Sequence, residues 1–573
     1  MTADSRYDAV VVGGGHHGTI IACYLAKAGL SVGVFERNSN LGGAAASEAG
    51  PAPGFRMNCC AHWTRFYGHP AYRDFGLHAE RLRYVFPDEN QSMVFEDGSS
   101  LLGYAAFKVV EHATGRSVYA QENVDRTYRQ IRQFSQRDAD TYLQLLEKYS
   151  QYWKAALDKH RFTPPSAWDV EDPLEELLGN PDSGIEPVHQ YMTMRQLAYD
   201  FFESAELRTL FMRAAAIATG CFADDVIGLQ GLIHALPSTL SFEPAAVAIG
   251  ATQSVTDALV SAGRRMGVEH FTNAEVDEIL ASRSHAVGVR LKGGAQIRAE
   301  IVVSALGVSQ TILRLMRNLN VSDRILRRVR NIHYDRGQLF SVNVALHEPP
   351  EYSAALFNPG IGPQSRLLWG AKDPDYLASR YQAEIFLKGY ADRLYAFSSV
   401  DTAWDPSRAP DGKHLATINE LAAPRRLFTR EQWREIKEAY KDQLLRQWRH
   451  YAPNMTRDNV IAISVVAPDD IEAKLPDMLE GGYCEGTAIA SQLGCFRPIP
   501  ELAQYRAVLS NVYICSSSAH SGSGIGRGSS YNCFYAIAAD LGLTFDSAES
   551  RPAVPATDLG TAHRGAVADQ APW

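Results

Sequence analysis

Short runs of β-branched residues alternate with segments of helical periodicity in two parts of the chain. Residues 7–12 form such a run, residues 19–29 place apolar side chains on one side of a helix, and residues 30–35 form a second strand. A second group of segments predicts a helix at 252–266 and four strands, at 268–271, 275–281, 286–291 and 296–304. Strand, helix and strand in this order predict the α/β class, with helices packed on a largely parallel sheet.

Other segments predict a second, α+β part. Residues 339–346 alternate between apolar and polar positions and predict a strand with one apolar face. Polar segments with apolar residues at helical spacing predict helices at 121–160, 192–202, 204–216 and 433–451. Residues 182–187 predict a loop, and the proline-containing tail over 547–573 has little apolar content and predicts disorder.

A glycine loop lies between the first strand and the first helix. Gly13, Gly15 and Gly18 form the pattern G-x-G-x-x-G. In this pattern the first glycine permits a tight turn, the second lets the backbone approach a pyrophosphate, and the third lets helix and strand pack closely. The helix N-terminus adds free N–H groups. His16 and His17 are interpreted as ordinary helix-start residues, and the loop predicts a dinucleotide site.

An acidic residue ends the second strand, as the dinucleotide motif requires. Glu36, 18 residues after Gly18, is placed to accept hydrogen bonds from the adenosine ribose. Arg37 follows it, and Gly42, Gly43 and Ala44 come shortly afterwards. This arrangement resembles the FAD-dependent family of amine oxidases and phytoene desaturases, and the Gly-Gly-Gly-His-x-Gly loop looks most like the phytoene desaturase-related branch. The resemblance implies FAD as cofactor, a Rossmann-like FAD-binding domain, and contact of the Gly-Gly pair with the diphosphate.

Two further blocks carry the same resemblance. Residues 274–305 are similar to the second piece of the family's FAD domain, which implies that backbone groups of Val276 pair with adenine and that Ser304 approaches the adenosine end. A strand at 512–515, a small-residue loop and a helix at 531–541 resemble the desaturase C-terminal motif, whose loop lies against the flavin ring and ribityl chain. This loop departs from the motif at Ser516, Ser521 and Ser523. The resemblance implies that four residues of this loop contact the cofactor: Ser517, Gly522, Gly524 and Ile525.

These blocks predict one discontinuous domain interleaved with another. The FAD-binding domain is expected to comprise residues 1–80, 245–316 and 503–546. Residues 81–244 and 317–502 are expected to form the substrate-binding domain.

Four residues are candidates for the reacting site. His62 follows the diphosphate loop, in a stretch that runs toward the flavin in the resembled family, and its titration range suits proton transfer. Arg65 could bind a carboxylate or enolate oxygen. His520 lies in the C-terminal motif, and Tyr483 in a stretch that matches related desaturases. A structural role is the alternative for each of them. Cys59 and Cys60 suggest covalent flavin attachment or, preferably, a packed pair of small side chains.

The resemblance favours a desaturase or dehydrogenase, in which a hydride leaves carbon for flavin N5 and a C=C bond forms. Amine oxidation is an alternative, although the strand near 338–346 lacks the lysine that many amine oxidases carry. Two further alternatives are a redox-neutral FAD-dependent isomerase and a flavin-binding protein without turnover. The expected substrate is a small, moderately polar organic molecule. O2, a quinone or another carrier would reoxidise the flavin.

Composition excludes several other classes. The 573 residues include 56 basic and 65 acidic side chains, a net charge of -9, which disfavours nucleic acid as a partner. Eight scattered cysteines contain no Cys-x-x-Cys pair, so we expect no metal site and a reducing compartment. No signal peptide and no long apolar run are evident, which predicts a cytoplasmic protein without a transmembrane segment. Peripheral membrane contact and the oligomeric state stay open.

Overall fold

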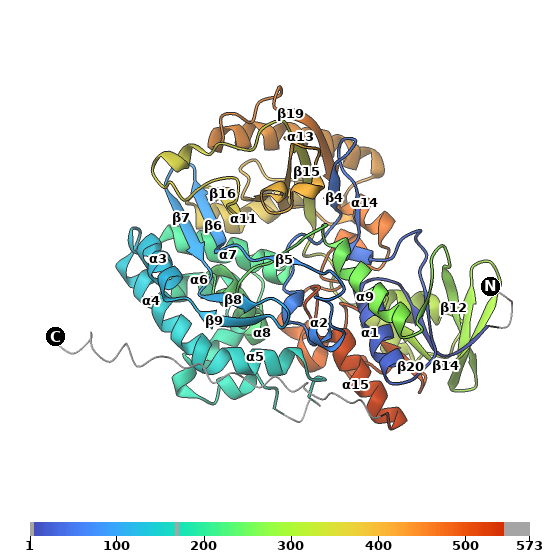
Figure 1. The fold of residues 1–573 in the computed structure, drawn as a ribbon. Helices are drawn as coiled ribbons and strands as arrows, with labels where there is room; N and C mark the ends of the chain where they lie inside the picture. Colours follow the sequence, from blue (N-terminus) through green and yellow to red (C-terminus); the bar gives the residue numbers. More distant parts are fainter. Residues whose placement is uncertain (1–4, 167–170, 544–573) are drawn as a thin grey trace.

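A computed structural model describes residues 5–166 and 171–543 of the chain. Two seven-stranded sheets organise this part of the molecule (Figure 1). The tail for which disorder is predicted lies outside the described residues.

The first sheet contains every strand predicted for the nucleotide-binding part. Its order is β11-β2-β1-β14-β13-β12, with β20 beside β14. Strands β11, β2, β1, β14 and β20 are parallel to one another, and β13 and β12 extend the sheet from β14 with antiparallel pairing. The strands are β1 (Arg6–Val12), β2 (Val32–Phe35), β11 (Glu269–Phe271), β12 (Val276–Ser282), β13 (His285–Leu291), β14 (Gln296–Ser304) and β20 (Val512–Ile514).

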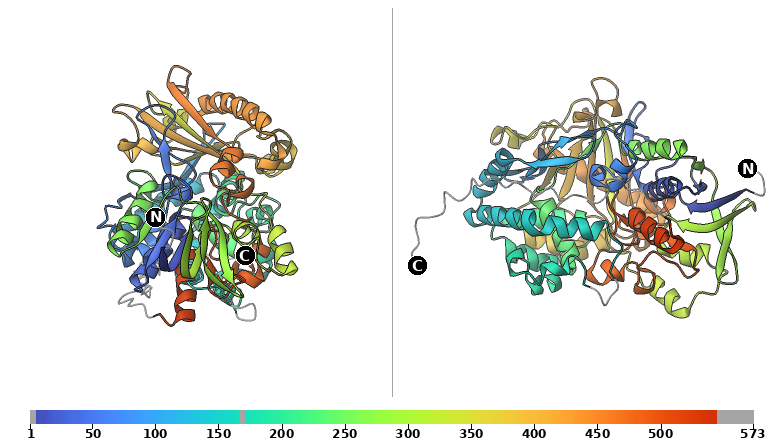
Figure 2. Two further views of the ribbon diagram at one scale, coloured as in Figure 1. Left: turned by 90° about the vertical axis from the view of Figure 1, so that its right-hand side faces the viewer. Right: turned by 60° about the horizontal axis from the view of Figure 1, so that its bottom comes forward.

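Three helices cover one face of the first sheet. In Figure 2, α1 (His16–Lys27), α9 (Gln253–Arg265) and α15 (Ser529–Leu541) lie side by side although they are far apart in the sequence. They share one hydrophobic cluster with the sheet. Helix α1 begins at His16, three residues earlier than predicted, so that Gly18 lies inside its first turn. A glycine there allows the turn to pack directly on the loop before it.

The second sheet has the order β19-β15-β18-β17-β16-β6-β7. Its neighbours are antiparallel except for β16 and β6, which are parallel. The strands are β6 (Glu89–Phe95), β7 (Ser100–Tyr104), β15 (Leu339–Leu346), β16 (Leu367–Gly370), β17 (Ala396–Val400), β18 (His414–Leu421) and β19 (Val460–Val466).

Both faces of β15 are buried, whereas its pattern predicted a single apolar face. Helix α13 (Arg430–Tyr451), at the top of Figure 1, packs on the apolar face, where the rings of Phe340 and Tyr440 stack 4.1 Å apart. The other face carries Ser341 and Asn343, which are buried as well. Both side chains have hydrogen-bond partners inside the protein, so this face looks toward other protein groups and not toward solvent.

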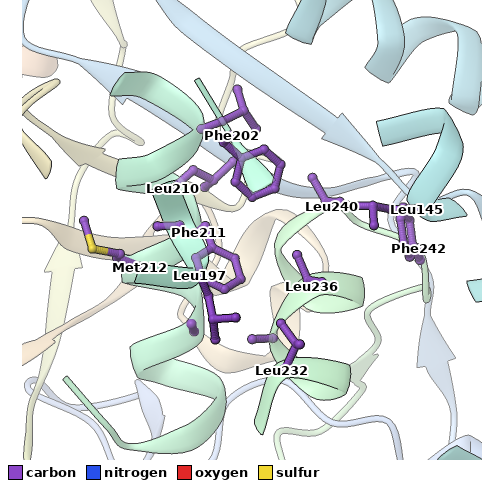
Figure 3. Close-up of a cluster of buried hydrophobic side chains, with 14 of the residues drawn as sticks. Leu145, Leu197, Phe202, Leu210, Phe211, Met212, Leu232, Leu236, Leu240 and Phe242 are labelled. Carbon is purple, nitrogen blue, oxygen red and sulfur yellow. The ribbon is translucent and has the colours of Figure 1, made fainter. Parts of the chain in front are cut away.

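A layer of helices borders the β6–β7 end of the second sheet. It confirms helical structure in the predicted segments 121–160, which is divided among several helices, 192–202 and 204–216, and it adds α8, which was not predicted. Phe211, Leu197, Leu232 and Leu236 lie between facing helices (Figure 3). The predicted loop over 182–187 is bordered by short 3-10 turns. The helices are α3 (Gln121–Arg132), α4 (Gln136–Lys148), α5 (Lys154–Arg161), α6 (Met194–Phe201), α7 (Ala205–Thr219) and α8 (Gly228–Thr239).

Shorter elements connect these layers. The strands are β3 (Ser47–Ala49), β4 (Arg56–Asn58), β5 (Tyr84–Val85), β8 (Phe107–Glu111), β9 (Arg116–Tyr119) and β10 (Val247–Ala248). The helices are α2 (Pro70–Asp74), α10 (Asp323–Arg330), α11 (Pro374–Arg380), α12 (Phe386–Lys388) and α14 (Pro468–Lys474).

The strands of the two sheets come from different parts of the sequence, in the order that the predicted domains require. The division into two domains with the boundaries given above stays a prediction. Within residues 5–166 and 171–543, no helix combines the length and the apolar character that crossing a membrane needs.

Candidate functional site

The carboxyl ends of four parallel strands meet at one edge of the first sheet. Val12 of β1 pairs with Phe35 of β2 and with Ser304 of β14, and Ser304 pairs with Ile514 of β20. The loops that follow these strands therefore start side by side. Open α/β sheets bind their ligands at this edge.

The three motif glycines have the geometry that their proposed roles need. Gly13 has a φ of 99°, in the left-handed region that favours glycine. A methyl group on Gly18 would lie 1.9 Å from the carbonyl oxygen of Gly13, so helix and loop are in direct contact. A methyl group on Gly15 would meet only the Cα of Gly43, at 3.8 Å. The space beside Gly15 is thus open for a bound group.

The N-terminus of α1 points its free N–H groups at this open space. Gly15 precedes the helix and provides no side-chain cap, and the first turn contains no acidic residue. The first N–H groups of a helix have no partner within it and carry a partial positive charge. The arrangement suits a phosphate or diphosphate.

His16 and His17 are buried in the first turn. The imidazole of His17 contacts Ser530 Oγ at 2.7 Å and Ser517 Oγ at 3.3 Å, which joins α1 to the C-terminal loop. The Nε2 atom of His16 is buried without a partner among the described residues, and burial lowers the pKa of this side chain to about 4. His17 therefore does more than start a helix, which the sequence did not indicate because its partners lie about 500 residues away.

Glu36 closes the side of the glycine loop. Its carboxylate accepts hydrogen bonds from the backbone N–H groups of Gly14 and Asn38, both at 2.8 Å, and it is buried. Arg37 is exposed next to it. The predicted ribose contact of Glu36 stays a prediction, and its carboxylate retains lone pairs for such a contact.

The Gly-Gly pair lies against the first glycine loop. The N–H of Gly42 donates to the carbonyl of Gly14 at 2.9 Å, and Gly15 and Gly42 form an isolated parallel bridge. Gly42 and Gly43 both have positive φ values, and Ala44 follows in a short 3-10 turn. The two loops form one glycine-lined cradle at the N-terminus of α1.

Val276 and Ser304 are both buried. The carbonyl oxygen of Val276, at the start of β12, accepts a hydrogen bond from Arg314 at 3.0 Å. The hydroxyl of Ser304 lies 2.7 Å from that of Thr311. Adenine pairing through Val276 and adenosine contact near Ser304 stay predictions.

The C-terminal loop returns to the same edge of the sheet. Gly522 and Gly524 have φ values of 92° and 121°, and Ile525 is buried. The hydroxyl of Ser517 is the one that contacts His17. Ser521, Gly522 and Ser523 also line a pocket with residues of α8 and of the segment before the loop, namely Gln230, Gly231, His234, Cys484, Ala488, Leu493 and Arg497.

Arg497 holds this loop in place. Its buried guanidinium donates to the carbonyl oxygens of Cys484 and Ser517, both at 2.7 Å, and to that of Ala519 at 3.3 Å. Arg497 lies in the same stretch as Tyr483, which matches related desaturases, and its role depends on contacts that no local pattern shows.

Asp477, which is half-buried, and Glu485, which is buried, form a carboxyl pair that sequence reasoning missed. Glu485 accepts a hydrogen bond from the N–H of Ser518 at 3.1 Å. Burial and the neighbouring carboxyl raise the pKa of Glu485, and burial raises the pKa of Asp477 as well. A methyl group on Gly307 would lie 3.4 Å from the Cβ of Asp477, so the pair adjoins the turn after β14.

The stretch that contains His62 and Arg65 contacts the second sheet and the C-terminal loop. The Nε2 atom of His62 is 3.2 Å from Ser341 Oγ on β15, and its Nδ1 atom is buried without a partner among the described residues. Burial lowers the pKa of His62 to about 4. Arg65 donates to the carbonyl oxygen of Pro244 at 3.3 Å, and a methyl group on Gly526 would lie 3.1 Å from the carbonyl oxygen of Arg65. This stretch therefore meets both β15 and the C-terminal loop.

The other two catalytic candidates use their polar atoms in the protein. The Nε2 atom of His520 is 2.8 Å from the carbonyl oxygen of His160, and burial lowers its pKa to about 3. The hydroxyl of Tyr483 donates to the carbonyl oxygens of Ile217 at 2.7 Å and Ala216 at 3.2 Å. These contacts favour structural roles for both side chains.

The Cys59 thiol donates to Glu48 and contacts Lys474, and burial raises the pKa of both Cys59 and Cys60. Protonated, buried thiols are poor nucleophiles, so the packed-pair interpretation of Cys59 and Cys60 is the better one. Among the described residues, no group of three His, Cys, Asp or Glu side chains is placed to hold a metal ion.

The chain is similar to known proteins over nearly its whole length. Residues 11–75 match the model of an NAD(P)-binding Rossmann-like domain. The chain is 24% identical to a component of limonene dehydrogenase from Castellaniella defragrans, over 98% of this chain and 100% of that protein. It is 24% identical to the carotenoid 3,4-desaturase of Haloarcula japonica, over 53% of this chain and 57% of that protein.

Solved structures share the fold of this chain. The structure of putrescine oxidase bound to putrescine covers 94% of this chain and 99% of its own, with a TM-score of 0.56 and 14% identity. An oxidoreductase from Methanosarcina mazei covers 92% of this chain and 99% of its own, with a TM-score of 0.57 and 15% identity. At these identities the structures establish the shared fold alone.

Proposed function

We propose that this chain, a member of the amine oxidase and desaturase superfamily of flavin-dependent oxidoreductases, binds FAD and removes a hydride from a carbon atom of an organic substrate. The superfamily is the one that the sequence motifs indicated. The observation that carries the proposal is the meeting of the glycine cradle, Glu36 and the C-terminal loop at one helix N-terminus and one sheet edge.

The residues at this edge fit a flavin dinucleotide. The open space beside Gly15 and the uncapped N-terminus of α1 would hold the diphosphate, and Glu36 would accept from the adenosine ribose. The loop over 516–526 would lie along the flavin. When bound, FAD supplies a two-electron acceptor that can take a hydride.

Oxidation at carbon is favoured over oxidation at nitrogen by the second sheet. None of its seven strands contains a lysine, the residue that many amine oxidases place on a strand of the substrate domain. The relatives whose names state a dehydrogenation or desaturation support the same chemistry. The substrate would lose a hydride from one carbon and a proton from its neighbour, and a C=C bond would form.

His62 is the best candidate to take that proton. Its depressed pKa keeps the imidazole neutral at neutral pH, and no described residue bonds its Nδ1 atom. Ser341 fixes the other side of the ring. The backbone of Arg65 lies against Gly526 of the C-terminal loop, and its guanidinium, 3.8 Å from Glu243, would orient a polar group of the substrate.

The proposal is tested by anaerobic titration of the purified protein. A flavin spectrum should be present, and a saturated ketone, acid or polyene precursor should bleach it, with formation of the unsaturated product. Bleaching by amines alone would overturn carbon oxidation in favour of amine oxidation. A flavin that stays oxidised with every candidate would contradict the oxidoreductase proposal.

A further inference from the structure

Positive charge exceeds negative charge around the stretch that contains His62 and Arg65. The groups that act on one another there come from six separate segments of the chain. The cations are Lys154, Arg161, Arg65, Arg366, Arg408 and Arg527, and the carboxylates are Asp158, Glu243 and Asp401.

All three carboxylates are already paired, Asp401 with Arg408 at 2.6 Å. Glu243 lies 3.5 Å from Arg161 and 3.8 Å from Arg65, and it accepts a hydrogen bond from Tyr149 at 2.7 Å. Asp158 lies 2.8 Å from Lys154 and 3.7 Å from Arg161. Within the described chain, none of these three carboxylates forms an ion pair with Arg366 or Arg527.

Arg366 is held by aromatic rings and not by an acid of the described residues. Its guanidinium carbon lies 4.6 Å from the ring centre of Trp63 and 4.4 Å from that of Phe397. It donates a long hydrogen bond, 3.4 Å, to the carbonyl oxygen of Asn90, and its buried Nε atom has no partner in this part of the chain. The rings fix the plane of the guanidinium and leave hydrogen-bond donors free.

Arg527 is a second cation without an acid partner among the described residues. It contacts the imidazole of His234 and donates to the carbonyl oxygen of Ser523 at 3.2 Å. Burial and the neighbouring Arg161 lower the pKa of Arg527 to about 9. Burial and the neighbouring Arg65 lower the pKa of Arg366 to about 9 as well.

A buried charge without a counter-ion is unfavourable unless a ligand supplies the opposite charge. Arg366 and Arg527 are both half-buried. Arg527 also lines the pocket that Ser521, Gly522 and Ser523 border. Arg366 is also close enough to His62 to contribute to the depressed pKa of that residue.

We propose that the substrate carries a carboxylate, and that Arg366 is the residue that binds it, with Arg65 and Arg527 extending the positive field. This assignment rests on the proposed function, because it names the substrate class of the same site. The carboxylate anchors the substrate next to His62, and a protonated amine is repelled. Arg366 is thus a specificity-determining residue.

The test is equilibrium binding to the purified flavoprotein by calorimetry, without turnover. The probes are 3-phenylpropanoate, octanoate and cyclohexanecarboxylate, each compared with its own amide. We expect at least one acid to bind 10-fold or more tightly than its amide. Arg366→Met should remove this preference, and Arg366→Lys should retain part of it. The control is Arg434→Met, at an exposed position of α13.

Equal affinities of acids and amides in the unaltered protein, or no binding of any acid, would overturn the assignment. So would a preference that survives in Arg366→Met, once the flavin content shows that this variant is folded. These outcomes leave the proposed function untouched, since anaerobic bleaching by an uncharged substrate reports on hydride transfer alone.

Discussion

The Cα of Gly18 faces the carbonyl oxygen of Gly13 so closely that a methyl group would sit 1.9 Å from that oxygen. Backbone oxygen atoms cannot move aside as a flexible side chain can. We expect Gly18→Ala to destabilise the protein by about 3 kcal/mol, or to abolish soluble expression. Thermal unfolding measures the loss. Gly293→Ala is the control, since nothing lies within 4 Å of that position, and an unchanged melting temperature in both variants would contradict the packing role.

Gly15 should behave in the opposite way. Its backbone conformation is accessible to alanine, and the added methyl group would enter open space next to Gly43. Gly15→Ala should therefore fold normally but lose at least about 10-fold in FAD affinity, because the methyl group blocks close approach of the diphosphate. Flavin content after dialysis and reconstitution measures this effect. Full flavin retention would show that the diphosphate lies elsewhere.

Glu36 contributes to both the loop and the proposed ribose contact. Glu36→Gln replaces one acceptor oxygen by an NH2 group, which accepts no hydrogen bond. The one remaining oxygen cannot accept from the N–H groups of Gly14 and Asn38 and from the ribose at the same time. We expect about 1–3 kcal/mol of lost stability and weaker flavin retention. Glu300→Gln, at an exposed residue of β14, is a control. Unchanged flavin occupancy in Glu36→Gln would contradict the ribose assignment.

His62 should matter for the rate of flavin reduction. If it takes the substrate proton, His62→Gln should slow anaerobic reduction by about 10²–10⁴-fold while flavin binding stays normal. Stopped-flow absorbance measures this rate. A loss smaller than about 5-fold would assign the proton to another group or to water.

The same residue should make stability depend on pH. The pKa of His62 is about 4 in the folded protein and near 6.5 when unfolded, so the unfolded state binds more protons between these values. The free energy of unfolding should therefore fall as the pH drops from about 6.5 to about 4. His62→Gln should show a shallower fall than the unaltered protein, measured by urea unfolding across this range. Equal slopes would show that His62 is not desolvated.

Tyr483 should be dispensable for the chemistry. Its hydroxyl donates to backbone carbonyl groups of α7, so Tyr483→Phe should cost about 1 kcal/mol of stability and change the reduction rate less than about 3-fold. A reduction slowed about 100-fold with normal flavin content would restore Tyr483 as an acid or base.

The cofactor side of the molecule could be predicted well from sequence. Strands β1 and β14 each begin with alternating exposed and buried positions and end in a buried apolar run followed by glycine or small residues, and this local pattern determines their structure. The glycine loop is predictable for the same reason, because each glycine meets a steric requirement set by neighbours in the motif itself.

The substrate side could not be predicted in the same way. The alternation in β15 identified its apolar face, but periodicity cannot distinguish a polar face in solvent from one that faces a buried histidine. Asp477, Glu485 and Arg366 lie in or next to irregular segments, and their roles depend on partners distant in sequence. Only the tertiary structure shows that Arg366 has aromatic neighbours and, among the described residues, no acid.

The interleaving of the first sheet has a consequence for biosynthesis. Strands β1 and β2 leave the ribosome early, but β14 and β20, which complete the sheet edge, follow after about 300 and 500 further residues. Contacts between segments so far apart form slowly, because long loops must close first. The nascent chain therefore carries an unfinished sheet through most of its synthesis, and the edge of β1 that pairs with β14 stays open until residues 296–304 have been made.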